Sequence, residues 1–182
     1  MATIAELLAS SLNALKQVQR GEDFTIIKSS DLSRTHIKRL VDNHFLKPII
    51  KGWYVVTDPR ATPGDSTAWY ASFWSFITRY ANERYGNEWC LSAEQSLSIY
   101  TGATIIPNQV LIRAPKGNDY MVPLIPPTSV FNLGAELPSK IDTNNPYNLN
   151  LYTLAEAIIV ATPTMYRNDA LTMRTALAMV HD

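Results

Sequence analysis

Residues 33–56 read SRTHIKRLVDNHFLKPIIKGWYVV, and this stretch decides how the first third of the chain is interpreted. In its first half, Ser33 can cap a helix. Four residues then recur at the 3.6-residue helical period on one side of that helix: Ile37, Leu40, Val41 and His44. The opposite side is polar and largely basic, with Thr35, Lys38, Arg39 and Asp42 flanked by Arg34, His36 and Asn43. The pattern predicts a helix over about 33–45 with one buried and one exposed side.

The second half of the stretch predicts a tight hairpin. Two β-prone runs, 46–50 and 53–56, are separated only by Lys51-Gly52, which suits a two-residue turn. Pro48 lacks an amide proton, so it must lie on the outer side of an edge strand. A turn this short provides no long loop, so Trp53 and Tyr54 are expected in the core and not as ligands.

Upstream, residues 3–19 predict an amphipathic helix that begins with a capping box at Thr3–Glu6 and ends before Gly21. The run 24–27 predicts a short strand, and 29–31 can cap a brief second helix. The resulting order is helix, strand, helix, helix and hairpin. This is the order of a winged helix-turn-helix, in which the third helix enters the major groove and the hairpin contacts phosphates or the minor groove.

The charges favour the same interpretation. Residues 1–56 carry eight Lys or Arg and five Asp or Glu, whereas residues 57–182 carry eight and eleven. A basic part joined to an acidic remainder is typical of a chain in which one part meets a polyanion. The candidate DNA-binding residues are Arg34, Thr35, His36, Lys38, Arg39, Asn43, Lys47 and Lys51. The alternative is that these side chains form the solvated side of an ordinary helix.

The remainder of the chain predicts a second domain. Residues 58–63 resemble a linker, and a long helix from about 66 to 85 follows, rich in Trp, Tyr and Phe. Four strand-like runs and further helices come next, the runs at 109–114, 120–125, 129–133 and 149–152. We therefore expect an α+β protein. A winged helix-turn-helix over 1–57 precedes a mixed α/β partner or dimerisation domain over 64–182, which has a small sheet and an aromatic-rich central helix.

Catalytic signatures are missing from the sequence. It contains no phosphate loop, no Gly-x-Gly-x-x-Gly, no Gly-x-Ser-x-Gly and no His-Glu-x-x-His, and its three His and single Cys do not have metal-ligand spacing. We expect no catalytic residue, no metal and no cofactor. A single cysteine and the lack of a secretory signal or a transmembrane stretch favour the cytoplasm and no membrane partner.

Several blocks of the sequence resemble a known family. The segments 32–54, 64–74, 89–97 and 113–117 are similar to the region that precedes the catalytic domain in some bacterial Fic-family (cell filamentation) proteins. More distantly, the architecture and the hairpin pattern that ends in Gly-Trp-Tyr resemble AbiEi-type antitoxins. That resemblance implies a winged helix followed by a mixed α/β domain, acting as a transcriptional repressor.

The chain departs from the Fic pattern where catalysis would require a match. It contains no His-Pro dipeptide, which the catalytic motif needs, and no inhibitory Ser/Thr-x-x-x-Glu motif. We therefore expect no enzyme activity. The chain is the regulatory part alone, a piece of a longer protein, or a separate paralogue.

Our leading prediction is a DNA-binding transcriptional regulator of antitoxin type that represses its own operon. The alternative is a protein-interaction or regulatory module of a Fic-type AMP-transferring protein. The expected partner is double-stranded DNA. Further candidates are a toxin or Fic-domain protein and a second copy of the chain in a homodimer.

Overall fold

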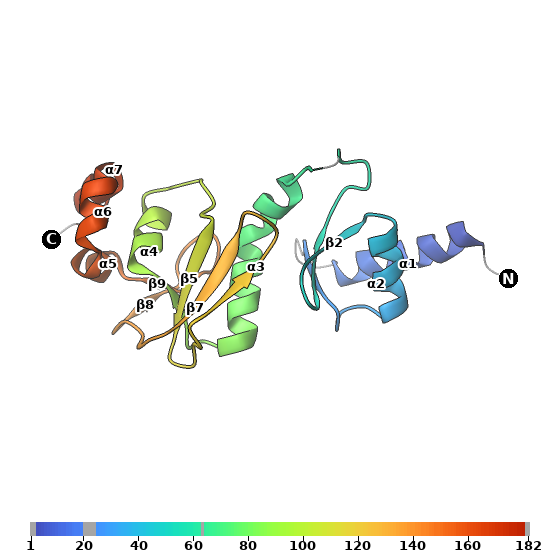
Figure 1. Cartoon of the computed structure of the whole chain (residues 1–182), viewed down its shortest axis with the longest axis horizontal. Helices are drawn as coiled ribbons and strands as arrows, with labels where there is room; N and C mark the ends of the chain where they lie inside the picture. The colour runs from blue at the N-terminus through green and yellow to red at the C-terminus, as the bar shows by residue number, and fades with distance from the viewer. Residues whose placement is uncertain (1–2, 20–24, 63, 181–182) are drawn as a thin grey trace. The chain divides into compact units, whose positions relative to one another are not determined.

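The computed structural model describes residues 3–19, 25–62 and 64–180 (Figure 1). It is an α+β protein with small sheets, and it divides into two compact units, Met1–Phe76 and Ile77–Asp182. The division falls inside the long helix α3 (Thr67–Tyr85), downstream of the linker that the sequence predicts at 58–63.

The first unit contains a three-stranded antiparallel sheet, two packed helices and the first half of α3. Ahead of α3, its elements in chain order are α1 (Ile4–Val18), β1 (Ile26–Lys28), α2 (Arg34–Asp42), β2 (Leu46–Ile50) and β3 (Trp53–Val56). The strands lie in the order β1-β3-β2. Apolar side chains from both helices and from the sheet form one core, comprising Leu15, Ile27, Leu32, Ile37, Leu40 and Leu46.

The brief second helix that the sequence predicts is a turn. The carboxylate of Asp31 accepts a hydrogen bond from the Lys28 amide at 2.8 Å, and the Asp31 amide donates back to the Lys28 carbonyl at 3.0 Å. The Ser29 amide donates to the carbonyl of Gly52 in the hairpin at 2.8 Å. Short polar side chains that form hydrogen bonds to nearby backbone groups compete with helix formation, and at residues 28–31 they stabilise a turn instead. A winged helix-turn-helix is therefore not confirmed, because the described residues ahead of α3 form two helices where that motif needs three.

The helix α2 ends three residues earlier than the sequence predicts. The Phe45 amide donates to the Leu40 carbonyl at 2.9 Å and the His44 amide to the Val41 carbonyl at 3.0 Å, which is the Schellman pattern. His44 has a φ of +61° and is exposed, so the prediction that it lies on the buried side of the helix is wrong. The reversal directs the chain straight into β2.

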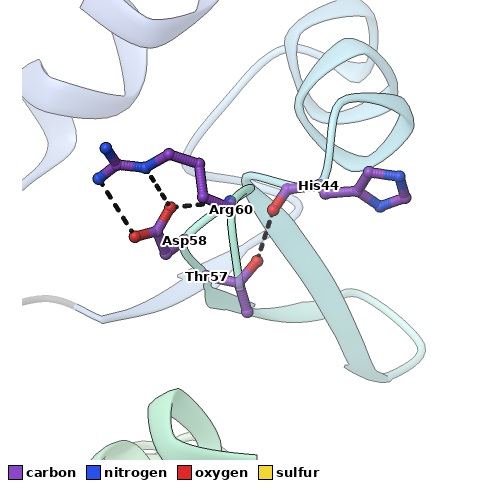
Figure 2. Close-up of polar contacts among 4 residues, drawn as sticks. All are labelled: His44, Thr57, Asp58 and Arg60. Carbon is purple, nitrogen blue, oxygen red and sulfur yellow. Dashed lines mark hydrogen bonds and ion pairs between the residues drawn. The ribbon is translucent and has the colours of Figure 1, made fainter. Parts of the chain in front are cut away.

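A polar contact joins this reversal to the end of β3. Figure 2 shows the Thr57 hydroxyl donating to the His44 carbonyl at 2.7 Å, with Asp58 and Arg60 paired beside it at 3.3 Å. The Thr57 amide also donates to the Phe45 carbonyl at 3.0 Å. The C-terminal end of α2 is thus fastened to the sheet.

The hairpin forms where the sequence predicts it. Gly52 adopts a φ of +83°, which side chains rarely tolerate, and a Cβ there would lie 3.2 Å from the Ser29 hydroxyl. Pro48 is exposed on the edge strand β2, and Trp53 is buried, both as predicted. The pairing shifts register between Pro48 and Ile50, which adds a bulge to the edge.

The second unit is built on a four-stranded mixed sheet. Its strands are β4 (Cys90–Leu91), β5 (Gln109–Ala114), β6 (Tyr120–Pro123) and β7 (Ser129–Gly134), in the order β4-β5-β7-β6. The β5–β7 pair is parallel and the other two pairs are antiparallel. In Figure 1 this sheet lies between the second half of α3 and α4 (Ala93–Tyr100).

Short elements complete the second unit: β8 (Ile141–Asp142), β9 (Leu151–Tyr152), α5 (Leu154–Val160), α6 (Pro163–Asn168) and α7 (Ala170–Ala178). The strands β8 and β9 form a separate antiparallel pair. The sequence interprets Thr162-Pro163 as a break, but Thr162 caps α6 and Pro163 occupies its first turn, where its missing amide proton costs nothing.

Most aromatic residues of α3 are buried, although Tyr70 is 37% exposed. Trp69, Phe73 and Phe76 are at most 1% exposed, and Tyr80 is 6% exposed. Phe76 lies edge-on to Trp53 of β3, with ring centroids 5.6 Å apart, so part of this cluster belongs to the first unit and not to the second sheet. Rings buried this deeply are not available for stacking on bases.

Candidate nucleic-acid interface

The exposed side of α2 brings several predicted DNA-binding residues together. Arg34, Thr35 and Lys38 are exposed, and with Arg39 and Asp42 they line a shallow surface hollow of about 520 Å³. Within the described residues, neither the Arg34 nor the Lys38 side chain makes a hydrogen bond or an ion pair. Two cations therefore face solvent one helical turn apart.

The first turn of α2 has the opposite charge from the one its dipole prefers. The Ser33 side chain caps the helix by accepting from the His36 amide at 3.3 Å, and the turn contains Arg34 but no acidic residue. A helix N-terminus carries a partial positive charge, so cations there are unfavourable, and like charges at i and i+4, as in Arg34 and Lys38, add to the cost. A bound anion would relieve both effects.

Arg39, by contrast, is engaged within the protein. Its Nη1 atom donates to the Leu7 carbonyl of α1 at 3.0 Å and to the Ser11 hydroxyl of α1 at 2.9 Å. His36 contacts the same hydroxyl, with Nδ1 3.0 Å from Ser11 Oγ. Two of the predicted DNA-binding residues thus lie in a network between the helices.

The proton count of this network limits how it can be arranged. The Ser11 hydroxyl has one proton, and both the Leu7 carbonyl, at 3.1 Å, and His36 Nδ1 lie within reach of it. All the contacts are satisfied together when the Ser11 hydroxyl donates to the Leu7 carbonyl and accepts from Arg39 and from His36, with His36 in the tautomer that carries a proton on Nδ1. Ser11 is fully buried, whereas its partners Leu7 and Arg39 are partly exposed.

The remaining predicted residues are spread over other parts of the unit. Asn43 caps the C-terminus of α2, with Nδ2 donating to the Arg39 carbonyl at 2.8 Å. Lys47 lines a second hollow, of about 640 Å³, beside Asp65. The pKa of Asp65 is lowered mainly by hydrogen bonds from Thr67, with a smaller contribution from Lys47. Lys51 is exposed at the hairpin tip.

Two relevant residues are not among those that the sequence predicts for this surface. Ser11 occupies the i, i+4 row between Leu7 and Leu15, so a polar residue in an apolar stripe is the available signal. Lys28 pairs with Trp53 across the sheet, and its Nζ lies 5.3 Å from the ring centroid. Since Trp53 follows the hairpin turn directly, Lys28 and Lys51 lie at the same end of the sheet.

Elsewhere, the described residues contain no cluster of three or more His, Cys, Asp or Glu side chains that could hold a metal ion. Burial raises the pKa of the Cys90 thiol to about 12, with Arg113 opposing the shift, so this cysteine is protonated at neutral pH. No described helix has both the length and the apolar composition needed to cross a membrane.

No protein-family model matches the chain, and no curated protein matches it either. The resemblance to Fic-associated regions and to AbiEi-type antitoxins therefore remains a prediction from the sequence.

Proposed function

We propose that the first unit binds double-stranded DNA and that the protein is a cytoplasmic transcriptional regulator of antitoxin type that represses its own operon. The observation that carries this proposal is the exposed N-terminal half of α2, where Arg34 and Lys38 face solvent and the first turn contains no acidic residue. Such a surface favours the binding of an anion.

The dimensions of α2 suit the major groove. Nine residues form a helix about 13 Å long, and a helix with its side chains fits a groove about 12 Å wide. Arg34 and Lys38 would contact phosphates or guanine edges, and Thr35 would hydrogen-bond a base or the backbone. Asp42, at the far end of the hollow, repels phosphate and favours contact through the N-terminal half of the helix.

The hairpin supplies a second contact under this proposal. Lys51 is exposed at its tip, and the turn after β1 is hydrogen-bonded to Gly52. The α2 helix begins directly after that turn, so its cationic first turn and the hairpin tip lie near the same end of the unit. Lys51 would contact phosphate and carry no sequence information.

A salt titration tests the proposal. The full chain is titrated with duplex from the region upstream of its own gene and with random duplex of equal length. Tighter binding to the upstream duplex, with an affinity that falls steeply as salt rises, is expected because each phosphate contact releases counterions. Lys38→Ala should lower the salt slope by about one.

Lys140→Ala, which removes an exposed cation from the second unit, is the matched control and should leave the slope unchanged. Equal affinity for both duplexes would refute the regulatory function. Equal slopes for Lys38→Ala and the wild type would refute the role of α2.

One observation favours the second candidate, a protein-interaction module of a Fic-type AMP-transferring protein or a toxin-binding surface. Large apolar side chains are exposed on the last helices, with Ile159 at 81%, Leu171 at 78% and Leu177 at 51%. Exposed apolar groups of this size are typical of protein contacts. Co-expression with a toxin or Fic-domain protein encoded beside the gene tests it, since Leu171→Ser should weaken the complex and Lys38→Ala should not.

A further inference from the structure

Arg39 lies on the same helix as the proposed DNA contacts, but its guanidinium bonds α1. We infer that Arg39 is a positioning residue, which with Ser11 fixes α2 against α1 and does not contact DNA. The DNA part of this inference rests on the proposed function, whereas the clamp between the helices stands on contacts within the protein. We name Arg39, Ser11 and the Leu7 carbonyl the α1–α2 clamp.

The geometry of the clamp restricts movement in a way that apolar packing does not. A single nitrogen, Arg39 Nη1, reaches two acceptors on α1, the Leu7 carbonyl at 3.0 Å and Ser11 Oγ at 2.9 Å. The planar guanidinium holds its donors in a fixed fork, and hydrogen bonds from a charged donor are stronger than neutral ones. Apolar contacts between the helices, such as Leu15 with the α2 side chains, tolerate small sliding movements.

The clamp sits where it can set the orientation of the exposed cations. Arg39 follows Lys38 directly and lies five residues after Arg34, so fixing its side chain fixes the rotation of α2 about its own axis. That rotation decides which side chains project away from α1. We expect sequence discrimination, which depends on exact placement of side chains at base edges, to depend on the clamp more than phosphate contact does.

Direct base contact by Arg39 would dismantle this arrangement. The guanidinium would have to leave a buried hydroxyl and a carbonyl that it now bonds, and the loss of a partner by a buried polar group is costly. Arg34 and Lys38 can reach DNA with no such loss. The same helix therefore divides its cations between an internal and an external role.

The test compares four variants of the full chain: Arg39→Ala, Arg39→Lys, Ser11→Ala and the Ser11→Ala/Arg39→Ala double variant. Ser11 is fully buried and cannot touch DNA, so it reports on the clamp alone. Each single variant should reduce the preference for upstream over random duplex about tenfold. The double variant should lose no more of this preference than the single variant that loses more. Arg39→Lys should not rescue, because it keeps the charge but not the fork.

The salt slope separates positioning from contact. If Arg39 only positions α2, Arg39→Ala leaves the slope of the wild type unchanged, whereas Lys38→Ala lowers it by about one. A slope lowered by about one in Arg39→Ala, with Ser11→Ala behaving as wild type, would overturn the inference and make Arg39 a direct DNA contact. Rescue of the preference by Arg39→Lys would overturn it as well.

If the wild type shows no preference for its own DNA, the proposed function is refuted but the clamp is not. Unfolding by urea then tests the clamp by itself. The Ser11→Ala and Arg39→Ala substitutions should each raise the unfolding equilibrium constant about tenfold, and the double variant by much less than a hundredfold. Additive effects would refute the clamp. If Arg39→Ala does not fold, the same cycle is run with Arg39→Lys.

Discussion

The helices α2 and α3 make opposite use of their side chains. The nine-residue α2 buries Ile37 and Leu40 and presents cations to solvent, whereas the nineteen-residue α3 buries most of its large rings. The longest helix among the described residues thus contributes most of its aromatic side chains to the core. The candidate function lies on a short helix whose ends are both fixed by hydrogen bonds.

The largest effect that sharpens this comparison is expected from Phe73→Ala. Phe73 is fully buried and lies edge-on to Trp69 and Trp74, at centroid distances of 5.3 and 5.1 Å. Removing the ring leaves a cavity, and the free energy of unfolding should fall by about 3–5 kcal/mol in urea denaturation. Tyr70→Ala on the same helix, at 37% exposure, is the control and should cost less than about 1 kcal/mol. Similar losses in the two variants would contradict the buried role of the α3 rings.

A second test removes the hydroxyl of the last residue of α3. The Tyr85 hydroxyl donates to Asn132 Oδ1 at 2.9 Å, and Asn132 is fully buried. Tyr85→Phe should lower the free energy of unfolding by about 1–3 kcal/mol, because a buried amide oxygen loses its shorter hydrogen bond. Tyr120→Phe, at 60% exposure, removes a hydroxyl from the surface and should leave thermal and urea unfolding unchanged. Equal stability of the two variants would show that the Asn132 contact adds nothing.

The end of α2 predicts a smaller effect. Thr57 holds the reversal after this helix through its hydroxyl, which donates to the His44 carbonyl (Figure 2). Thr57→Val keeps the shape and removes the bond, so the free energy of unfolding should fall by about 1 kcal/mol. Thr62→Val, at an exposed position of the following segment, is the control. An unchanged urea midpoint for Thr57→Val would mean that backbone bonds alone hold the reversal.

The smallest and most telling change is Arg34→Ala, which should separate stability from binding. The substitution removes a cation from a helix N-terminus and a like charge from the vicinity of Lys38, so the free energy of unfolding should rise by about 0.3–1 kcal/mol. Affinity for duplex should fall, with the salt slope lowered by about one. If Arg34→Ala destabilises the chain and leaves binding intact, α2 is an ordinary solvated helix.

Local patterns in the sequence account for much of the fold. The hairpin follows from Lys51-Gly52 between two β-prone runs, and the N-terminal helix follows from its capping box, whose reciprocal bonds are both present. The runs at 109–114 and 129–133 match β5 and β7 closely. These elements are encoded by residues close to one another in the chain.

The sequence-based predictions fail where contacts between residues far apart in the chain determine the local structure. Residues 29–31 can cap a helix, but a bond to Gly52 and the Lys28–Asp31 turn prevent it. The two-residue strands β4 and β8 exist only because partners lie beside them. In the candidate site, the partners of Arg39 lie 28 and 32 residues away, and no spacing rule could have distinguished Arg39 from Lys38.

The left-handed residue after α2 also limits how many base pairs the helix can contact. With His44 turned back and its carbonyl bonded to Thr57, α2 cannot lengthen when it meets a ligand. At about 13 Å it spans roughly four base pairs of a duplex that rises about 3.4 Å per pair. Four specified pairs recur by chance roughly once in a few hundred, far too often to mark one operon in a genome. Under the proposed function, selectivity would have to come from at least two such units reading adjacent stretches of the same duplex.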